Sequence, residues 1–324
     1  MNAIKQTKFY KKFSSQISAV LALLVLVIVL TVLSDRFMTA GNLMSVLNQI
    51  SYLSIMAIGI TGVIMSGCFD LSVAATLAFS VTVAGHLTIT LGWPGWIFIP
   101  VALFIGAVCG CVAAAGITSL DLPPFVVTMA LMNVYRGLGS VITNGYSAQG
   151  MPDLVRFIGS GKIGGVFPFA ILLMLALYVI EWFILQKTPI GLKIYAVGGN
   201  PVAAQLSGIR VRSVRFFCYI QNGILAAISG IVLVGRMNST SSILAEGVEM
   251  DAIAAVVIGG TSLAGGIGNI WGTIIGSIVM GVVRNGMNLL QISAFWQKVA
   301  LGILVFLACA IDAVRQKREK SKVS

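Results

Sequence analysis

Charged residues are scarce in this 324-residue sequence: they make up 10% of the chain, and only ten of them are acidic. Hydrophobic residues make up 58% of the chain, and the mean hydropathy is +0.99. This balance lies far outside the usual range for a soluble domain. The composition therefore excludes an ordinary soluble globular protein and predicts a membrane protein.

Signatures of catalysis are also missing. A P-loop needs the pattern G-x-x-x-x-G-K-[ST], and the glycine-rich stretch "GGTSLAGGIG" (259–268) lacks the lysine and the hydroxyl that follows it. The sequence contains neither H-E-x-x-H nor a nucleophile elbow. We therefore expect no catalytic residue and no cofactor in this chain, which is predicted not to be an enzyme.

Cysteine and histidine show no spacing that indicates a disulfide or a metal site. Cys109 and Cys111 share the stretch "GAVCGCVAAAG", and the other three cysteines are scattered in apolar runs. The single histidine, His86, has no cysteine or carboxylate at ligand spacing. We predict that the cysteines are small packing residues, that no metal is bound and that His86 has no functional role.

Long apolar runs are what the sequence has instead. The first run, 17–33, is near the length that crosses a hydrocarbon core of about 30 Å at about 1.5 Å per residue. No small-residue cleavage site follows it, so we expect a retained span rather than a signal peptide. The prediction is an all-α polytopic membrane protein, a single transmembrane domain over 1–324. About ten spans are expected, near 17–33, 50–66, 71–91, 97–117, 125–143, 166–185, 216–236, 251–265, 269–287 and 295–312.

The net charge of +11 does not indicate nucleic-acid binding, because the basic residues lie in three separate clusters. Fourteen of the 21 lie in the tail 1–16, in the loop 186–215 and in the tail 313–324. Basic loops stay on the cytoplasmic side of a membrane. Ten spans place both tails and the long loop inside, and place the loop 144–165 and the stretch 237–249 outside.

Small and polar residues interrupt two of the apolar runs, at "MSGCFDLS" (65–72) and "IGGTSLAGGIGNIWG" (258–272). Both interruptions predict broken or re-entrant helices. Such breaks are tolerated at membrane depth only where freed backbone groups face protein or a water-filled path. Each break is therefore a candidate part of a translocation path, and the second contributes Gly260, Thr261 and Gly265.

Asp70 is the carboxylate with the clearest case for a place deep in the membrane. With Ser72 it fits a helix start, since an aspartate at the N-cap accepts from the second or third helical amide and suits the positive end of the helix dipole. An ionisable side chain at this depth also fits a residue that shapes a polar path. Both interpretations stay open, and Asp70 and Ser72 are candidate path residues.

Four more polar residues are candidates for the path. Asn133 and Arg136 lie in the fifth predicted span, where Arg136 either pairs with a carboxylate or extends toward an interface. Glu249 and Asp251 open the eighth span, where acidic residues also suit a helix start.

The inside loop contains a predicted short helix. Asn200 fits its N-cap, residues 201–207 favour helix, and Gly208 is placed to end it. Such a helix either joins two spans along the membrane surface or forms a docking surface for a soluble partner, and the residues alone leave both open.

Five blocks of the sequence carry a family resemblance: "GCFDLSVAATLA", "PPFVVTMALMNVYRGL", "GLKIYAVGGNPVAAQLSGI", "MDAIAAVVIGGTSLAGGIGNIWGTIIGSIVMGVVRNGMNLL" and "SAFWQKVALGILVFLACAID". Through them nearly the whole chain resembles the permease subunits of bacterial ABC importers for monosaccharides. The resemblance implies a multi-pass subunit of the bacterial inner membrane that passes a sugar through the lipid bilayer. It also places both breaks near the path.

The resemblance further implies three protein partners: a second permease, either a copy or a close paralogue; a cytoplasmic ATPase that binds ATP and magnesium; and a secreted sugar-binding protein. It identifies "GGNPVAAQLSGI" as the loop that meets the ATPase. The residues of this coupling loop are Gly199, Asn200, Ala204, Ser207, Gly208 and Ile209.

Two positions depart from the family pattern, because Cys68 and Ala74 stand where glycine is common. Side chains there narrow the closest backbone approach, so the sugar stays open among ribose-like pentoses, hexoses and sugar-derived signals such as autoinducer-2. The alternatives are a secondary transporter coupled to protons or sodium, and an ABC permease for branched-chain amino acids or nucleosides. A structural scaffold is disfavoured, because it would give the broken helices no purpose.

Overall fold

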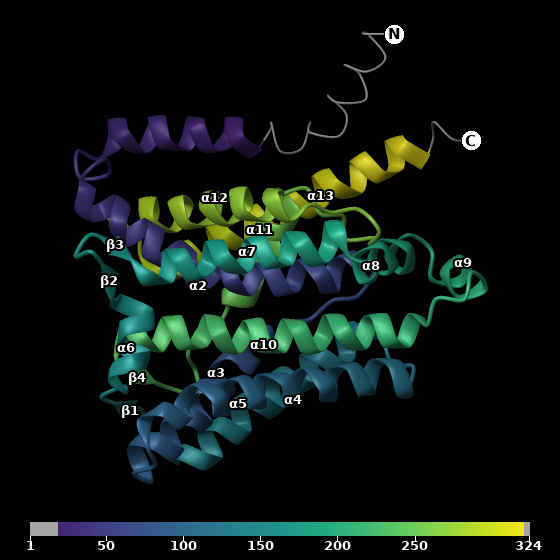
Figure 1. Ribbon diagram of the computed structural model, residues 1–324. Coiled ribbons are helices and arrows are strands. Elements are labelled where there is room, and N and C mark those ends of the chain that lie inside the picture. The colour runs from purple at the N-terminus through teal and green to yellow at the C-terminus, as the bar shows by residue number, and fades with distance from the viewer. Residues whose placement is uncertain (1–18, 321–324) are drawn as a thin grey trace.

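Helices form most of the chain (Figure 1), which confirms the all-α prediction. The structure, a computed structural model, describes residues 19–320. A helix at Ala19–Leu33 comes first. The helices that follow are α2 (Ala40–Met65), α3 (Val73–Gly85), η1 (His86–Thr90), η2 (Gly95–Ile97), α4 (Phe98–Ser119), α5 (Pro124–Thr143), α6 (Asp153–Ser160), α7 (Phe169–Lys187), α8 (Pro189–Gly199), α9 (Pro201–Leu206), α10 (Val211–Met237), α11 (Val248–Ile258), α12 (Ile270–Leu289) and α13 (Ala294–Lys320).

The predicted count of ten spans is not confirmed. Within residues 19–320, seven helical segments are long and apolar enough to cross a membrane, and two shorter apolar helices lie at Ala19–Leu33 and Ala294–Leu307. The predicted span 251–265 is different, because its helix α11 has only 11 residues and stops at Ile258. A glycine-rich loop, 259–269, continues to α12, so this region crosses only part of the bundle as helix.

Helix α10 lies at the centre of the bundle (Figure 1), with α2, α7 and α12 on one side and α3, α4 and α5 on the other. Its contact with α4 is close because Gly106 and Gly110 of α4 face the backbone of α10 at Gly223 and Tyr219. A Cβ at either α4 glycine would collide with a carbonyl oxygen of α10. Small residues four apart allow such an approach between helices in a membrane.

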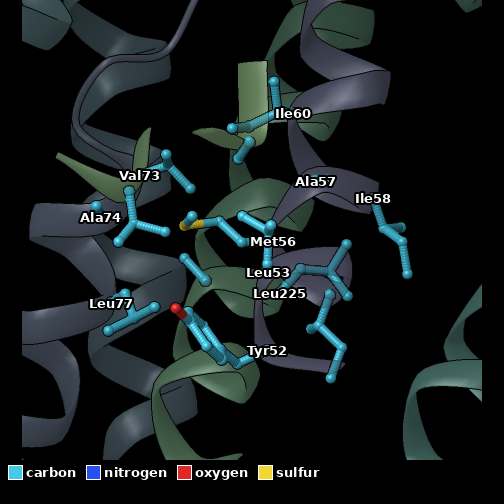
Figure 2. Close-up of a cluster of buried hydrophobic side chains, with 14 of the residues drawn as sticks. Tyr52, Leu53, Met56, Ala57, Ile58, Ile60, Val73, Ala74, Leu77 and Leu225 are labelled. Atoms are coloured by element: carbon cyan, nitrogen blue, oxygen red, sulfur yellow. The ribbon is translucent and has the colours of Figure 1, made fainter. Parts of the chain in front are cut away.

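The apolar core lies where α2, α3 and α10 meet. Figure 2 shows Met56 of α2 beside Val73 and Ala74 of α3, with Leu225 of α10 close by. Met56, Val73 and Ala74 are fully buried. Large apolar residues elsewhere point outward, among them Phe104 of α4, as expected for helices whose outer faces contact lipid. The core therefore holds the two helices that flank the first predicted break against α10.

Two short antiparallel pairings lie at one end of the bundle (Figure 1), called here the β end. Strand β1 (Ala148–Gln149) pairs with β4 (Ser239–Thr240), and β2 (Lys162–Ile163) pairs with β3 (Phe167–Pro168). The first pairing joins the two loops predicted to lie outside. Helices α8 and α9 lie at the opposite end, called here the α9 end, so the predicted inside and outside loops occupy opposite ends.

The ends of the described chain point to the α9 end. In Figure 1 the beginning of Ala19–Leu33 and the last turns of α13 are both directed that way. Helix α13 continues to Lys320, so part of the predicted tail 313–324 is helical. The predicted tail 1–16 lies outside the described residues. That both termini and the loop 186–215 lie on the cytoplasmic side stays a prediction.

Candidate functional site

The first break, residues 66–72, is a non-helical segment between α2 and α3. It turns at Gly67, whose φ of +78° favours glycine. Asp70 is buried, and its Oδ1 accepts hydrogen bonds from the Ser72 amide at 2.8 Å and the Ser72 hydroxyl at 2.6 Å. The predicted N-cap needs correction: Ser72 is the N-cap residue of α3, and Asp70 forms a side-chain turn two residues ahead of it.

Helix α10 holds this segment through two side chains. The Asn222 amide donates to Asp70 Oδ2 at 2.7 Å, and the Tyr219 hydroxyl donates to the Phe69 carbonyl at 2.7 Å. Asn222 is the twelfth of the 27 residues of α10, about 17 Å along its axis. Asp70 is therefore fixed near mid-depth of the bundle.

Asp70, Ser72 and Asn222 form one hydrogen-bonded cluster, called here the Asp70 cluster. Both Asp70 oxygens accept bonds from Ser72 and Asn222. Asn222 fits beside α2 because position 59 is glycine, where a Cβ would collide with the Asn222 side chain. Within residues 19–320, Asn222 Oδ1 is buried and accepts no hydrogen bond. Asp70 thus fixes the shape of the broken segment.

Sequence reasoning missed both α10 residues and a second buried carboxylate, Glu181 of α7. Glu181 is 3% exposed and accepts a hydrogen bond from Gln221, the residue next to Asn222. Neighbouring carboxamides of α10 therefore hold two buried carboxylates on different elements. A signal existed in each case, since Glu181, Gln221 and Asn222 are polar residues inside predicted apolar spans.

The second break, residues 259–269, is shaped chiefly by glycine. Gly260, Gly265 and Gly266 have φ of +92°, +85° and +72°, a region that other residues adopt at a cost. The loop closes on itself because the Ser262 amide donates to the Ile267 carbonyl at 3.0 Å. Thr261 is buried within it.

The fold brings the two breaks together. The Gly266 amide donates to the carbonyl of Met65, the last residue of α2, at 3.0 Å. A Cβ at Gly265 would lie 2.8 Å from the Cα of Gly67. Two segments about 200 residues apart in sequence therefore touch through their backbones, near the α9 end.

Arg136 and Glu249 lie away from this meeting point, toward the β end. Arg136 Nη1 donates to the carbonyls of Ser242 at 3.0 Å and Leu244 at 3.2 Å. It thereby anchors the loop before α11, and its two predicted roles, pairing with a carboxylate and extension toward an interface, stay predictions. Glu249 lies in the first turn of α11, as expected for an acidic residue at a helix start.

Asp251 and Asn133 also lie apart from the breaks. Asp251, in the first turn of α11, forms an ion pair with Arg284 of α12, a partner that sequence reasoning did not identify. Asn133 is on the exposed face of α5, and its amide donates to the Met129 carbonyl one turn earlier at 3.1 Å. The structure therefore does not gather the nine predicted path residues into one cluster within this chain.

The coupling loop contains the predicted short helix. Asn200 is the N-cap of α9, with its side chain accepting from the Ala203 amide at 3.0 Å. Gly208, at φ +82°, follows the end of the helix. Ala204 is buried, and the Ile209 amide donates to its carbonyl at 3.0 Å. Gly199, Asn200 and Ser207 are exposed, so α9 presents most of its surface outward.

The two residues that depart from the family pattern, Cys68 and Ala74, lie in the core. Cys68 and Ala74 are both buried, at 1% and 0% exposure. Cys109 and Cys218 are buried as well, which fits the prediction that cysteines act as small packing residues. Among the residues that the structure describes, no group of histidine, cysteine and acidic side chains could hold a metal ion.

Comparisons with known proteins cover nearly the whole chain. Residues 42–309 match the family described as branched-chain amino acid transport system / permease component. The chain is 36% identical to a ribose import permease of Haemophilus influenzae and 39% identical to one of Bacillus subtilis, each over 298 residues. Each match covers 90% of this chain and 91% of the relative. It is 31% identical over 307 residues to a fructose import permease of Rhizobium meliloti, covering 91% of this chain and 85% of the relative. No solved structure matches.

Proposed function

Since this chain belongs to the family of branched-chain amino acid transport system permease components, we propose that it is the membrane-spanning permease subunit of an ATP-driven importer for a monosaccharide. The observation that carries the proposal is full-length similarity to sugar import permeases at 31 to 39% identity. The relatives are named as transport proteins, and the chain is correspondingly a transport subunit rather than an enzyme. It is a multi-pass membrane protein.

The substrate class follows from those relatives. The family description mentions branched-chain amino acids, whereas the similar proteins import ribose, fructose and, at 28% identity, xylose. A ribose-like pentose is the first substrate to test, and hexoses and autoinducer-2 are the next. Nucleosides and branched-chain amino acids are the competing classes within the family.

The two breaks are the proposed inner parts of the path. Support comes from their contact with each other and from the rule that irregular backbone at membrane depth lines a cavity or is buried in protein. Asp70 and Ser72 shape the first break, and Gly260, Thr261 and Gly265 shape the second. Arg136 and Asp251 hold the β end of the proposed path through the contacts described above, and Glu249 lies in the first turn of α11 with Asp251.

A second permease subunit is the proposed partner within the membrane. Asn133 is exposed on α5 among large apolar residues such as Val134 and Leu138. An amide on a lipid-facing surface is costly, whereas polar groups are common where helices of a bundle face each other. A second copy or a close paralogue covering this face would place Asn133 in the shared path.

A cytoplasmic ATPase is the proposed partner at the α9 end. Helix α9 carries two exposed apolar side chains, Val202 at 67% and Leu206 at 84%, beside the polar residues of the coupling loop. The ATPase would bind ATP and magnesium, and a secreted sugar-binding protein would dock at the β end. Both termini would then be cytoplasmic, in a bacterial inner membrane.

A secondary transporter coupled to protons or sodium is the second candidate function, because two buried carboxylates lie at depth. Ion coupling needs carboxylates or broken helices free to coordinate the ion. Both Asp70 oxygens are occupied by protein donors, and Glu181 accepts from Gln221. These contacts favour a structural role, and dependence of uptake on a partner ATPase separates the two functions.

The test is purification of the tagged chain from its native host in mild detergent, followed by identification of the proteins that come with it. We expect a P-loop ATPase in stoichiometric amount. Uptake of labelled ribose by cells, with unlabelled fructose, xylose, leucine and adenosine as competitors, then identifies the substrate class. A chain that is reproducibly alone and still transports would contradict the proposal.

A further inference from the structure

Helix α8 touches both breaks at once through its last residues. Gly198 is buried where a Cβ would collide with the Met65 carbonyl oxygen and the Gly266 amide nitrogen. Its own carbonyl oxygen lies 2.8 Å from the place that a Cβ on Gly265 would occupy. The end of α8 is therefore seated against the end of α2 and against the second break with no room for a side chain.

Tyr195 adds a directed contact three residues earlier. Its hydroxyl donates to the carbonyl of Gly268, in the second break, at 3.0 Å. The same hydroxyl accepts from the Gln186 amide of α7 at 2.9 Å. One half-buried side chain thus connects α7, α8 and the loop 259–269.

The connection from α8 to the proposed docking helix is short and well formed. Only Asn200 separates α8 from α9, and it belongs to both helix ends. The backbone amide of Asn200 donates to the Ala196 carbonyl at 3.1 Å, and the side chain of Asn200 caps α9. Because no flexible linker separates the two helices, a displacement of α9 should be passed on to Gly198 at the end of α8.

We propose that Tyr195 and Gly198 are positioning residues that transmit movement of α9 to both broken segments at the same time. This inference rests on the proposed function, because α9 moves only if a partner ATPase presses on it. Backbone contact at Gly198 couples α8 to the end of α2 and to residues 265–266. The Tyr195 hydroxyl couples α8 to residue 268, so the two breaks move as one unit.

The test uses the complete importer from the native host, reconstituted in proteoliposomes, with labelled ribose as the probe. The quantity measured is ribose imported per ATP hydrolysed. Tyr195→Phe removes one hydroxyl without changing shape, so we expect normal assembly and ATP hydrolysis with about two- to tenfold less import per ATP, the span that one net hydrogen bond represents. Gly198→Ala should reduce the ratio further.

Gly41→Ala is the matched control, because Gly41 is an exposed glycine of helix α2, outside the coupling loop and both breaks, and a Cβ there would have nothing within 4 Å. It should keep the wild-type ratio. A wild-type ratio in Tyr195→Phe and in folded Gly198→Ala would overturn the inference. If Gly198→Ala does not fold, Tyr195→Phe still decides.

The change in hydrogen exchange on adding ATP gives a second readout, because it compares the same complex with and without ATP and so separates coupling between the segments from overall stability. Adding ATP to the wild-type complex should alter amide protection in 66–72 and 259–269 together, and Tyr195→Phe should uncouple the second segment from the first. If amide protection in both segments still changed together in Tyr195→Phe when ATP is added, transmission through Tyr195 would be contradicted. Failure of the wild-type complex to import ribose, fructose or xylose would instead contradict the proposed function.

Discussion

The two breaks meet in space but are held by different means. Residues 66–72 are fixed by side chains, since Asp70 is bonded to Ser72 and Asn222, and Tyr219 holds the Phe69 carbonyl. Residues 259–269 are fixed by backbone, through left-handed glycines and contacts that exclude a Cβ. One break is therefore specified by polar chemistry and the other by the absence of side chains.

The difference predicts how each break fails. Loss of a hydrogen bond in the first break leaves a buried polar group unsatisfied. A second substitution that supplies a new partner for that group can recover the lost stability. A side chain added to the second must displace backbone, and no single substitution elsewhere relieves that. The first break should thus show strong pairwise coupling between residues, and the second should show steric intolerance.

The largest expected effect is that of Gly266→Val in the second break. A β-branched residue at φ +72°, with its Cβ 2.6 Å from the Gly199 Cα, combines backbone strain with a clash. We expect a loss of about 3 kcal/mol or more in the free energy of unfolding, measured by denaturant titration in detergent. Gly164→Val is the control, because Gly164 has φ +61° but nothing within 4 Å of a Cβ. Equal losses in both variants would show that strain alone acts.

Asn222→Leu should have the next largest effect, because it removes the amide donor from Asp70 Oδ2 in a buried site. We expect a loss of about 2 to 4 kcal/mol, since a buried acceptor without its donor bears its desolvation cost. A double-mutant cycle with Asp70→Asn measures the coupling by thermal unfolding. Additive losses would contradict the paired arrangement.

Asp70→Asn alone should be milder and should preserve assembly. An amide keeps one acceptor for Ser72 but turns a donor toward the Asn222 amide, so we expect a loss of about 1 to 2 kcal/mol and reduced uptake. Adding Asn222→Asp exchanges the carboxylate and the carboxamide between the two positions, and it should recover part of the lost stability and part of the lost uptake. Wild-type uptake by Asp70→Asn at normal expression would show that the charge does not shape the path.

Tyr219→Phe should have the smallest effect of the series. It removes one hydrogen bond, to the Phe69 carbonyl, and leaves the ring in place, so we expect a loss of about 1 kcal/mol in thermal unfolding. Tyr146→Phe is the control, because Tyr146 is 79% exposed and should show no change. A loss as large as that of Asn222→Leu would place the main anchor of the first break at Tyr219.

The positions of both breaks were predictable from sequence, because glycine and serine interrupt apolar runs there. The partners that fix them were not. Asn222 lies 152 residues from Asp70, and only the fold shows that α10 passes the first break at mid-depth. The span predicted at 251–265 is not confirmed as a full helix, because hydropathy does not distinguish a full helix from a half-helix followed by an apolar loop.

The coupling loop shows the same limit. Its local features, Asn200 as a cap and Gly208 after the helix, follow from rules that act over a few residues. The contacts of Gly198 depend on three segments that lie far apart in the sequence. The polar residues Glu181 and Gln221 carried a readable signal, as interruptions of apolar spans, and were missed nevertheless.

ATP-driven uptake by the reconstituted complex tests the central claim most directly. This chain and its co-purified partners are reconstituted in proteoliposomes. Labelled ribose and binding protein are added on the side of the membrane that the β end faces, and ATP is supplied on the side that the α9 end faces, where the ribose should accumulate. The account predicts accumulation that requires ATP and that stops when ATP is replaced by a non-hydrolysable analogue. Accumulation driven by a proton or sodium gradient without ATP would contradict it.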